Sequence, residues 1–187
     1  MKPASRVWLA AVALALCASP APAGIERLDL AKMLERAETA LHGEITSARV
    51  FRAFDERTST PFYFTLLVIV GESLLDGSPL TQEVTVYGGY LSEEEGASYS
   101  EAPAADDIRV GNTVVGFTKW TDDMGAGVAG HCFYASHGGV YRVVVDSKDS
   151  TVLGRGAGYA IERNVKLSSL RSSISEVQKE RIERERK

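Results

Sequence analysis

Residues 62–70 read FYFTLLVIV, a run that is apolar at every position except Thr65. Its β-branched and aromatic content favours a strand, and the run is too short to cross a membrane as a helix. Because apolar side chains would point to both sides of this strand, we predict that it is the central strand of the core, covered on both faces. A turn at 55–61 precedes it, and Gly71 with the turn cluster at 76–79 ends it.

Other segments around this run have the composition of strands. We predict strands at 45–54, 82–87, 112–120 and 151–153. Residues 131–135 and 140–145 are predicted to form a hairpin around a turn at 136–139, because two alternating segments flank a short polar, glycine-rich connection.

Helical spacing appears at both ends of the segment that follows residue 23. Near the start, apolar residues recur at 30, 33, 34, 37 and 41, with Asp29 suited to an N-cap and Gly43 to a stop. Near the end they recur at 167, 170, 174 and 177, with Ser168 as a candidate N-cap. Residues 179–187 are almost all charged and predict a solvated end of the second helix.

Two polar segments are predicted to lie outside the core. Residues 91–109 contain six acidic residues among Gly, Ala, Ser and Pro, which predicts a long solvated loop that folding does not require. Its carboxylates lack the ordered spacing of a calcium loop. The glycines at 125, 127, 130, 154, 156 and 158 do not follow the pattern of a phosphate-binding loop, and we predict that 154–158 is a flexible link.

Residues 1–23 have the build of a secretory signal peptide. Lys2 and Arg6 precede an apolar run at 7–17, and Ala21-Pro22-Ala23 forms a small-residue cleavage site before Gly24. We therefore expect a secreted or periplasmic protein with no transmembrane segment in its mature chain. Residues 14–17 also resemble a lipobox, which leaves a lipid anchor at Cys17 as an alternative, although Leu16 stands where that motif has a small residue.

The expected organisation follows from this cleavage site. Residues 24–165 would form one β-barrel domain with its N-terminal helix, and 166–187 a C-terminal helix and charged tail. Cleavage would remove two basic residues and no acid, so the net charge falls from −4 to −6. An acidic chain lacks the clustered Lys and Arg that nucleic acids require, so we expect no nucleic-acid partner.

Cys132 is the only cysteine that remains after residue 23, so the mature monomer cannot form an internal disulfide. Its place in a strand beside Phe133 and Tyr134 predicts a buried, inert thiol. The alternative is a nucleophile activated by a base such as His137, which would make the protein a cysteine-dependent hydrolase. An acid/base hydrolase that uses a pair of carboxylates is a related alternative.

Histidine and cysteine near position 132 do not predict a metal site. His131 and Cys132 should point to opposite faces of their strand, and His137 falls in the predicted turn. His42 is the third histidine and lies at the end of the predicted first helix. Residues 128–132, VAGHC, resemble the histidine box of trypsin-like proteases, but no GDSGG segment follows. We therefore predict no catalytic residue, no metal and no cofactor.

The order of the segments carries a resemblance to known proteins. LLDG at 74–77, GG at 88–89, GNTVVGF at 111–117 and GVYRV at 139–143 resemble the pattern of a loose group of exported, mostly uncharacterised bacterial proteins. The pattern is also distantly similar to the OB-type barrel of netrins and tissue inhibitors. Tissue inhibitors chelate a protease's zinc through an N-terminal cysteine, which this chain lacks. The resemblance therefore implies a fold and no functional residue.

Together these patterns predict an α+β fold, in which a small, mostly antiparallel OB-like barrel of five or six strands has a helix at each end of the chain. The expected function is an exported, non-catalytic binding or structural module. Its partner would be a protein or a small molecule of the cell envelope. A hydrolase that uses Cys132 is the alternative.

Overall fold

The computed structural model describes residues 28–186, so the predicted signal peptide and Cys17 lie outside the described residues. The described chain is α+β, with two α-helices and a mostly antiparallel sheet. Within it, no helix combines the length and the apolar character needed to cross a membrane. The elements in chain order are α1 (Leu30–Arg36), β1 (Thr39–Phe54), β2 (Pro61–Ser73), β3 (Pro79–Tyr87), β4 (Gly89–Tyr90), β5 (Gly96–Ala97), β6 (Thr113–Thr121), β7 (Gly130–Phe133), the 3-10 helix η1 (Ser136–Gly139), β8 (Val140–Val144), β9 (Thr151–Val152), β10 (Val165–Lys166) and α2 (Leu167–Glu185).

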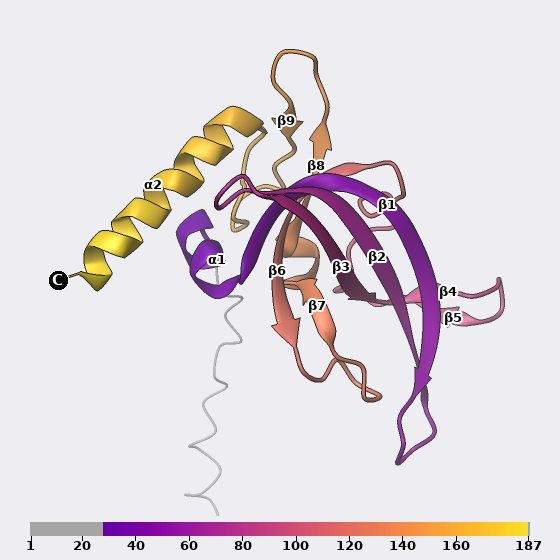
Figure 1. Cartoon of the computed structure of the whole chain (residues 1–187). Coiled ribbons are helices and arrows are strands. Elements are labelled where there is room, and N and C mark those ends of the chain that lie inside the picture. Colours follow the sequence, from indigo (N-terminus) through magenta and orange to yellow (C-terminus); the bar gives the residue numbers. More distant parts are fainter. Residues whose placement is uncertain (1–27, 187) are drawn as a thin grey trace, which may run out of the picture.

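The sheet has the strand order β10-β9-β8-β6-β1-β2-β3, with β7 also paired to β6. The long strand β1 arches over the molecule and pairs with β2 along its whole length, while β6 pairs only with its first half (Figure 1). No backbone pairing joins β3 to β7 in the part of the chain that the structure describes. The sheet is therefore open, and the predicted closed barrel is not confirmed.

Buried apolar residues gather on both faces of this sheet. An inner cluster lies inside the curve and consists of Leu41, Ile45, Leu67, Ile69, Val84, Val86, Val114, Phe133 and Val140. A helix-facing cluster packs under α1 and α2 and consists of Met33, Leu34, Ala40, Leu74, Val115, Phe117, Tyr141, Val143, Val152, Ile161, Leu167, Leu170 and Ile174. The helices cover only one end of the sheet (Figure 1).

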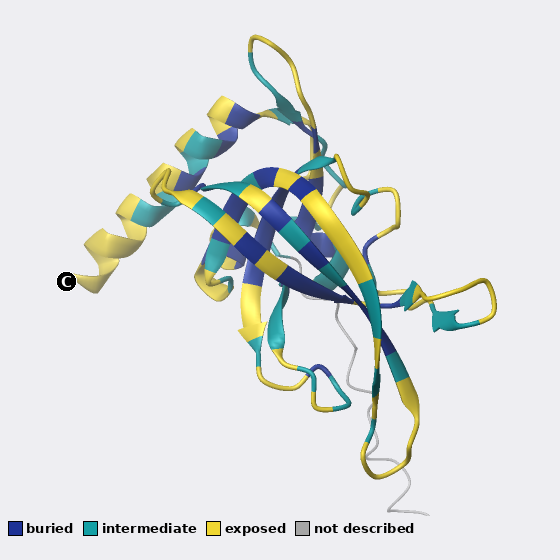
Figure 2. Ribbon diagram, turned by 45° about the vertical axis from the view of Figure 1, so that its right-hand side comes forward, coloured by how far each residue is buried: buried dark blue, intermediate teal, exposed yellow. Residues whose placement is uncertain are grey.

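The apolar run at 62–70 forms β2, an interior strand between β1 and the edge strand β3 rather than the predicted central strand. Leu67 and Ile69 are buried in the inner cluster, whereas Val68 is half-buried and Val70 is 44% exposed on the outer face. The alternation of buried and exposed residues along the long strands is visible in Figure 2. The prediction that both faces are covered is therefore wrong at Val70, because no helix or loop within residues 28–186 covers the outer face there and its neighbours Glu44 and Thr81 on β1 and β3 are exposed as well.

Helix α1 begins as predicted, because the Asp29 carboxylate accepts a hydrogen bond from the Lys32 backbone N–H at 2.8 Å. Its predicted end at Gly43 is wrong, since α1 stops at Arg36 and Gly43 lies inside β1. Leu41 satisfies the helical spacing from Leu34, but it also satisfies the two-residue period that continues to Ile45. Pairing with β2 and β6 decides in favour of the strand.

The predicted hairpin at 131–145 is wrong. β7 and β8 do not pair with each other; both pair antiparallel with β6, β7 with its last residues and β8 with its first. Between them η1 interrupts what is otherwise one edge of the sheet, with Ala135 and Ser136 at positive φ. Residues 136–139 therefore separate two strands that run in the same direction, and the chain does not reverse there as in a hairpin.

Helix α2 forms where the spacing predicted it, but Ser168 is not its N-cap. Lys166 occupies that position without a side-chain cap. The Asp149 carboxylate from the β8–β9 loop accepts a hydrogen bond from the Ser168 hydroxyl at 2.6 Å instead. An acidic side chain distant in sequence therefore hydrogen-bonds to the first turn of the helix, where negative charge is favourable.

Residues 91–109 are mostly irregular, as predicted, but they are anchored to the sheet. Ile108 packs against the inner cluster. The Asp107 carboxylate lies 2.7 Å from the Arg155 guanidinium, and both side chains are largely buried. Arg155 also donates a hydrogen bond to the Val140 carbonyl at 2.9 Å. The predictions of a dispensable loop and of a flexible link at 154–158 both overlooked these contacts.

Replacing residues 91–109 by a short Gly-Ser loop is expected to lower the free energy of unfolding by about 3 kcal/mol or more. The change removes the buried part of Ile108 and leaves the Arg155 charge without its carboxylate. Loop length itself contributes little, because closure entropy varies slowly with length. Urea unfolding measures the effect, and replacing only 92–94 at the exposed tip serves as the control. An unchanged midpoint for the long replacement would restore the original expectation.

Glu72 on β2 connects the sheet to α2. The Arg171 guanidinium donates a hydrogen bond to its carboxylate, and His42 Nδ1 lies 3.3 Å from the same oxygen. The hydrogen bond from Arg171 lowers the pKa of Glu72 below its usual value of 4.5, with His42 adding to the effect against a smaller opposing contribution of burial. A depressed carboxyl pKa stabilises the fold above that value, and the stabilisation disappears as the pH falls through the folded-state pKa.

The variant Arg171→Gln is expected to lose less stability than the parent when the pH falls from 5 to about 3, because the Glu72 pKa then returns toward its unfolded value. Thermal unfolding at a series of pH values measures this slope. Arg181→Gln on the same helix, whose partner Glu185 is well exposed, is the control with an unchanged slope. Parallel slopes for parent and Arg171→Gln would contradict the assignment.

Candidate functional site

The residues singled out around position 132 do not come together. His131 and Cys132 are neighbours on β7 and lie against different partners: the His131 ring contacts Trp120, and Cys132 Sγ is 3.2 Å from the Thr121 hydroxyl. Cys132 is half-buried, where full burial was predicted.

The other two histidines lie elsewhere. His137 lies in η1, with Nδ1 3.1 Å from the Glu101 carbonyl and Nε2 3.1 Å from the Tyr159 hydroxyl. His42 lies on β1 beside Glu72. Between residues 28 and 186 no three His, Cys, Asp or Glu side chains are placed to hold a metal ion. The constellation therefore offers neither a nucleophile with an adjacent base nor a ligand set.

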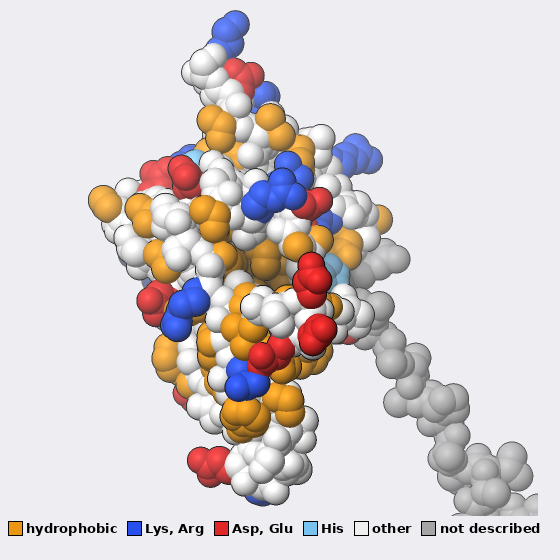
Figure 3. All heavy atoms as spheres, turned by 90° about the vertical axis from the view of Figure 1, so that its right-hand side faces the viewer, with side chains coloured by type: hydrophobic (Ala, Val, Ile, Leu, Met, Phe, Trp, Pro, Cys, Tyr) orange, Lys and Arg blue, Asp and Glu red, His pale blue; other side chains and the backbone are white. Residues whose placement is uncertain are grey.

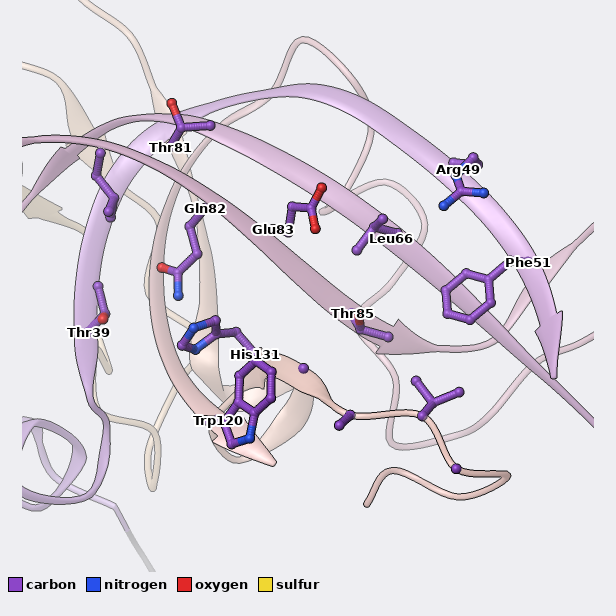
Figure 4. A pocket seen from close by; sticks show the side chains of 15 residues that line it. Thr39, Arg49, Phe51, Leu66, Thr81, Gln82, Glu83, Thr85, Trp120 and His131 are labelled. Carbon is purple, nitrogen blue, oxygen red and sulfur yellow. The ribbon is translucent and has the colours of Figure 1, made fainter. Parts of the chain in front are cut away.

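A groove of about 770 Å³ lies where β3 approaches the β6–β7 region. Figure 4 shows Trp120 and His131 on one side of it and side chains of β1, β2 and β3 on the other. We call it the β3 groove. It is lined by Thr39, Arg49, Phe51, Leu66, Leu80, Thr81, Gln82, Glu83, Thr85, Trp120, Gly127, Val128, Ala129, Gly130 and His131.

One wall of the β3 groove is an oriented aromatic pair. Trp120 is 45% exposed, and its indole N–H donates to the Asp122 carboxylate at 2.7 Å. The His131 ring packs edge to face on it, with 5.2 Å between the centroids. His131 Nδ1 is buried without a hydrogen-bond partner among the described residues. The hydrogen bond and the ring contact hold the indole in place while leaving nearly half of Trp120 open to a ligand.

The floor of the β3 groove carries opposite charges on an apolar base. Arg49, Leu66 and Thr85 lie side by side on β1, β2 and β3, and Glu83 is two residues before Thr85 on the same face. The Arg49 guanidinium lies 5.9 Å from the centroid of the Phe51 ring. Among the ion pairs of residues 28–186, none involves Arg49 or Glu83. Both charges are therefore available to a ligand.

The free edge of β3 borders the same groove. Gly88 N–H donates to the Tyr63 carbonyl and Ser73 N–H to the Ser78 carbonyl, which fixes the alternation of hydrogen-bonded pairs between β2 and β3. In an antiparallel pair, every second residue turns its N–H and C=O away from its neighbour. Among the residues that line the groove, Thr81, Glu83 and Thr85 do so. Their main-chain groups have no backbone partner among the described residues.

The edge of β7 is open in the same way. Tyr134 N–H donates to the Phe117 carbonyl, so His131 turns its main-chain groups away from β6. Across the gap a side-chain hydrogen bond of 3.2 Å joins the Thr118 hydroxyl to the Gln82 amide oxygen. β3 and β7 thus lie close together and are joined by side chains, although no backbone pairing links the two strands.

Other hollows and exposed surfaces offer a ligand fewer free groups than the β3 groove does. A second hollow of about 600 Å³ surrounds His137, but both ring nitrogens of this histidine already have partners within the chain. Figure 3 shows hydrophobic side chains mixed with charged ones on the side from which the β4–β5 hairpin projects. Phe54, Tyr90 and Leu91 are exposed, and none of them lines the β3 groove or the second hollow.

Sequence reasoning singled out His131 but missed Arg49, Phe51, Glu83 and Trp120. An Arg and a Phe two residues apart in a strand share a face, which is a readable signal. Nothing in the sequence indicates that this face meets Trp120, because the curvature of β1 brings the two regions together.

Comparisons of the chain with protein-family models, with curated proteins and with solved structures found no match.

Proposed function

We propose that this protein is an exported, non-catalytic binding module that takes its ligand in the β3 groove. The observation that carries the proposal is a groove of about 770 Å³ that combines a half-exposed Trp120 with the charges of Arg49 and Glu83, neither of which has an ion-pair partner within residues 28–186. Concave sites in which a few placed polar groups stand beside apolar and aromatic side chains are where proteins bind ligands. The ligand is a molecule of the cell envelope.

We further propose that the sheet is an OB-like barrel left open between β3 and β7, and the strand order supports this. β1, β2 and β3 follow one another as a meander, β6 returns beside β1, and β7 lies beside β6 and close to β3. OB-type barrels are partly open, and they bind ligands on the face of their second and third strands, between the loops that join strands 1 to 2 and 4 to 5. The β3 groove lies over β2 and β3 beside the β6–β7 loop, which is the corresponding place.

The contacts of Cys132 favour binding over hydrolysis. A catalytic thiol needs an adjacent base and an open approach. Cys132 hydrogen-bonds to Thr121 and the Lys119 carbonyl and does not line the β3 groove. The expected net charge of −6 after cleavage also disfavours nucleic acid as the ligand.

Export is proposed from residues 1–23, which lie outside the described residues. Cleavage after Ala23 is expected, and the intact mass of the exported protein measures it. A mass that includes residues 1–23, or a lipid on Cys17, would contradict this prediction.

Trp120 makes the binding proposal directly testable. The chain has two tryptophans, Trp8 and Trp120, so Trp120 is the only one in the chain that begins at Gly24. Its emission is therefore a reporter of the groove. We would titrate this chain with pools of peptides, cell-wall oligosaccharides and anionic vesicles, and follow emission together with the melting temperature. At least one pool is expected to change both.

A matched pair of variants tests whether the ligand binds in the β3 groove. Leu66→Arg places a long side chain on the groove floor and is expected to weaken binding at least about tenfold, since contacts worth about 1.4 kcal/mol account for such a factor. Val70→Arg changes the same outer face of β2 outside the groove and is expected to bind as the parent does. If no pool changes either the Trp120 emission or the melting temperature, the proposed function is overturned.

A further inference from the structure

We infer that the occupant of the β3 groove is an uncharged oligosaccharide, which lies across the strands with one sugar ring on the indole of Trp120. This inference rests on the proposed function and names the class of ligand. Three observations carry it: the direction of the groove, the free hydrogen-bonding groups and balanced charges of its lining, and the exposed indole.

The first observation is the direction in which the groove runs. Arg49 on β1 and Thr85 on β3 lie on either side of the same residue of β2. A Cβ on Gly130 would lie 3.3 Å from the Thr85 hydroxyl oxygen, so β7 continues the line beyond β3. The residue next to Gly130 pairs with Trp120 on β6. The groove therefore crosses the strands, with Arg49 and Trp120 on opposite sides of Thr85 (Figure 4).

This direction decides how a ligand lies. β7 is close to the edge of β3, and the hydrogen bond between Thr118 and Gln82 joins β6 to β3 across the gap. An added strand would need a space of about 4.8 Å beside β3, which β7 already occupies. The occupant is therefore an elongated molecule that crosses several strands and does not depend on backbone pairing.

The second observation is the hydrogen-bonding capacity of the lining. Thr39, Thr81 and Thr85 line the groove, and their hydroxyls form no hydrogen bond with any residue between 28 and 186. The side-chain amide of Gln82 uses only its oxygen within that range. A hydroxyl both donates and accepts, and an amide nitrogen donates. The lining thus offers donors and acceptors together, as the hydroxyl groups of a sugar require.

The charges of the lining balance each other. Apart from His131, the ionisable side chains among the described residues that line the groove are one base, Arg49, and one acid, Glu83. Both are exposed, and β2 lies between their strands. This balance selects neither an anion nor a cation. Sugar hydroxyls form charge-assisted hydrogen bonds with a guanidinium and with a carboxylate alike.

The third observation is the indole surface. Trp120 is 45% exposed, and its N–H is already bound to the Asp122 carboxylate, so the indole offers a ligand its ring and not its polar group. One face of a pyranose ring carries mainly C–H groups, and this apolar face packs on a flat aromatic surface while the hydroxyls at its rim remain free. A lipid chain would cover the same indole but leave the polar lining without partners.

The experiment uses the chain from Gly24 and isothermal titration calorimetry. The neutral probes are cellotetraose, maltotetraose and the tetramer of N-acetylglucosamine, each beside its monosaccharide. At least one tetrasaccharide is expected to bind at least about tenfold more tightly than its monosaccharide, because it fills more of the groove. Its dissociation constant is expected to change by less than about twofold between about 50 and 500 mM NaCl, since salt screens charge pairs and a neutral sugar forms none.

Aromatic variants test whether the sugar lies on Trp120. Trp120→Ala removes the indole and is expected to weaken binding of that tetrasaccharide at least about tenfold, whereas Trp120→Phe keeps a flat ring and retains most of the affinity. Tyr90→Ala removes an aromatic side chain that is 58% exposed outside the groove, and it is the matched control with the affinity of the parent. Melting temperatures check that each variant folds, and Leu66→Arg replaces Trp120→Ala if the latter does not.

The outcomes separate the two proposals. Equal affinities for tetrasaccharide and monosaccharide, or a neutral sugar that binds Trp120→Ala or its replacement like the parent, would overturn the oligosaccharide across the groove. Binding of a cationic chitosan tetramer, an anionic galacturonate tetramer, a peptide or a vesicle, but of no neutral sugar, would overturn the ligand class and leave a binding groove. If no probe of any class binds, the proposed function fails as well.

Discussion

Leu67→Asn is expected to leave the domain largely unfolded at room temperature. Leu67 is fully buried in the inner cluster, with Ala48 and Val84 beside it on the neighbouring strands. Removing the buried isobutyl group costs about 2–5 kcal/mol, and an amide without partners adds about 1–3 kcal/mol. The sum is comparable to the total stability of about 5–15 kcal/mol that domains possess. Far-UV circular dichroism and urea unfolding measure the loss.

Val70→Asn is the control for this prediction. It makes a similar chemical change three residues along the same strand, but Val70 is 44% exposed on the outer face. Its cost is expected to stay near 1 kcal/mol or less, in the range of surface substitutions. Equal loss in the two variants would mean that the two faces of β2 are equally covered, as the sequence predicted.

Gly71→Ala is expected to lower the free energy of unfolding by about 3 kcal/mol, which corresponds to a melting temperature lower by about 10 °C in a domain of this size. Gly71 faces Gly43 across the β1–β2 pair. A Cβ on Gly71 would lie 2.1 Å from the His42 carbonyl oxygen and 2.4 Å from the Gly43 Cα. Both are backbone atoms, so relief requires β1 to move away from β2 at the start of its arch.

Gly138→Ala in η1 is the matched control. Its Cβ would have the Ala135 Cβ as its nearest neighbour at 3.6 Å, which is ordinary van der Waals contact. A change of about 1 kcal/mol or less is expected, measured by differential scanning calorimetry beside Gly71→Ala. If Gly71→Ala melted like the parent, β1 and β2 would not approach as closely at this pair as the structure places them.

The errors of sequence interpretation share one cause. The helical spacing of residues 30–41 and the strand period that begins at Leu41 overlap, and only pairing with β2 and β6 resolves them. The segments at 130–133 and 140–144 have the pattern of a hairpin, but β6 is long enough to pair with both in succession. In each case a local pattern is compatible with two structures, and a distant strand selects one.

The contacts of the acidic loop at 91–109 likewise could not be read from the local sequence. Ile108 is a single apolar residue in a polar segment, and Asp107 is one carboxylate among six. Neither stands out by composition. Ile108 contacts the inner cluster and Asp107 pairs with Arg155 because the folded loop passes close to both partners.

The sequence by itself determined the α+β class, the interior place of the strand at 62–70, the helix start at Asp29 and the helical spacing near the C-terminus. These features depend on local periodicity and capping, which are properties of neighbouring residues. Only the tertiary structure decided that the sheet stays open and that Arg49, Glu83 and Trp120 border one groove. The reason is that the curvature of β1, which pairs with β2 along its whole length and with β6 along half of it, is set by contacts between strands far apart in the chain. No local sequence pattern specifies where the second half of such a strand lies in the fold.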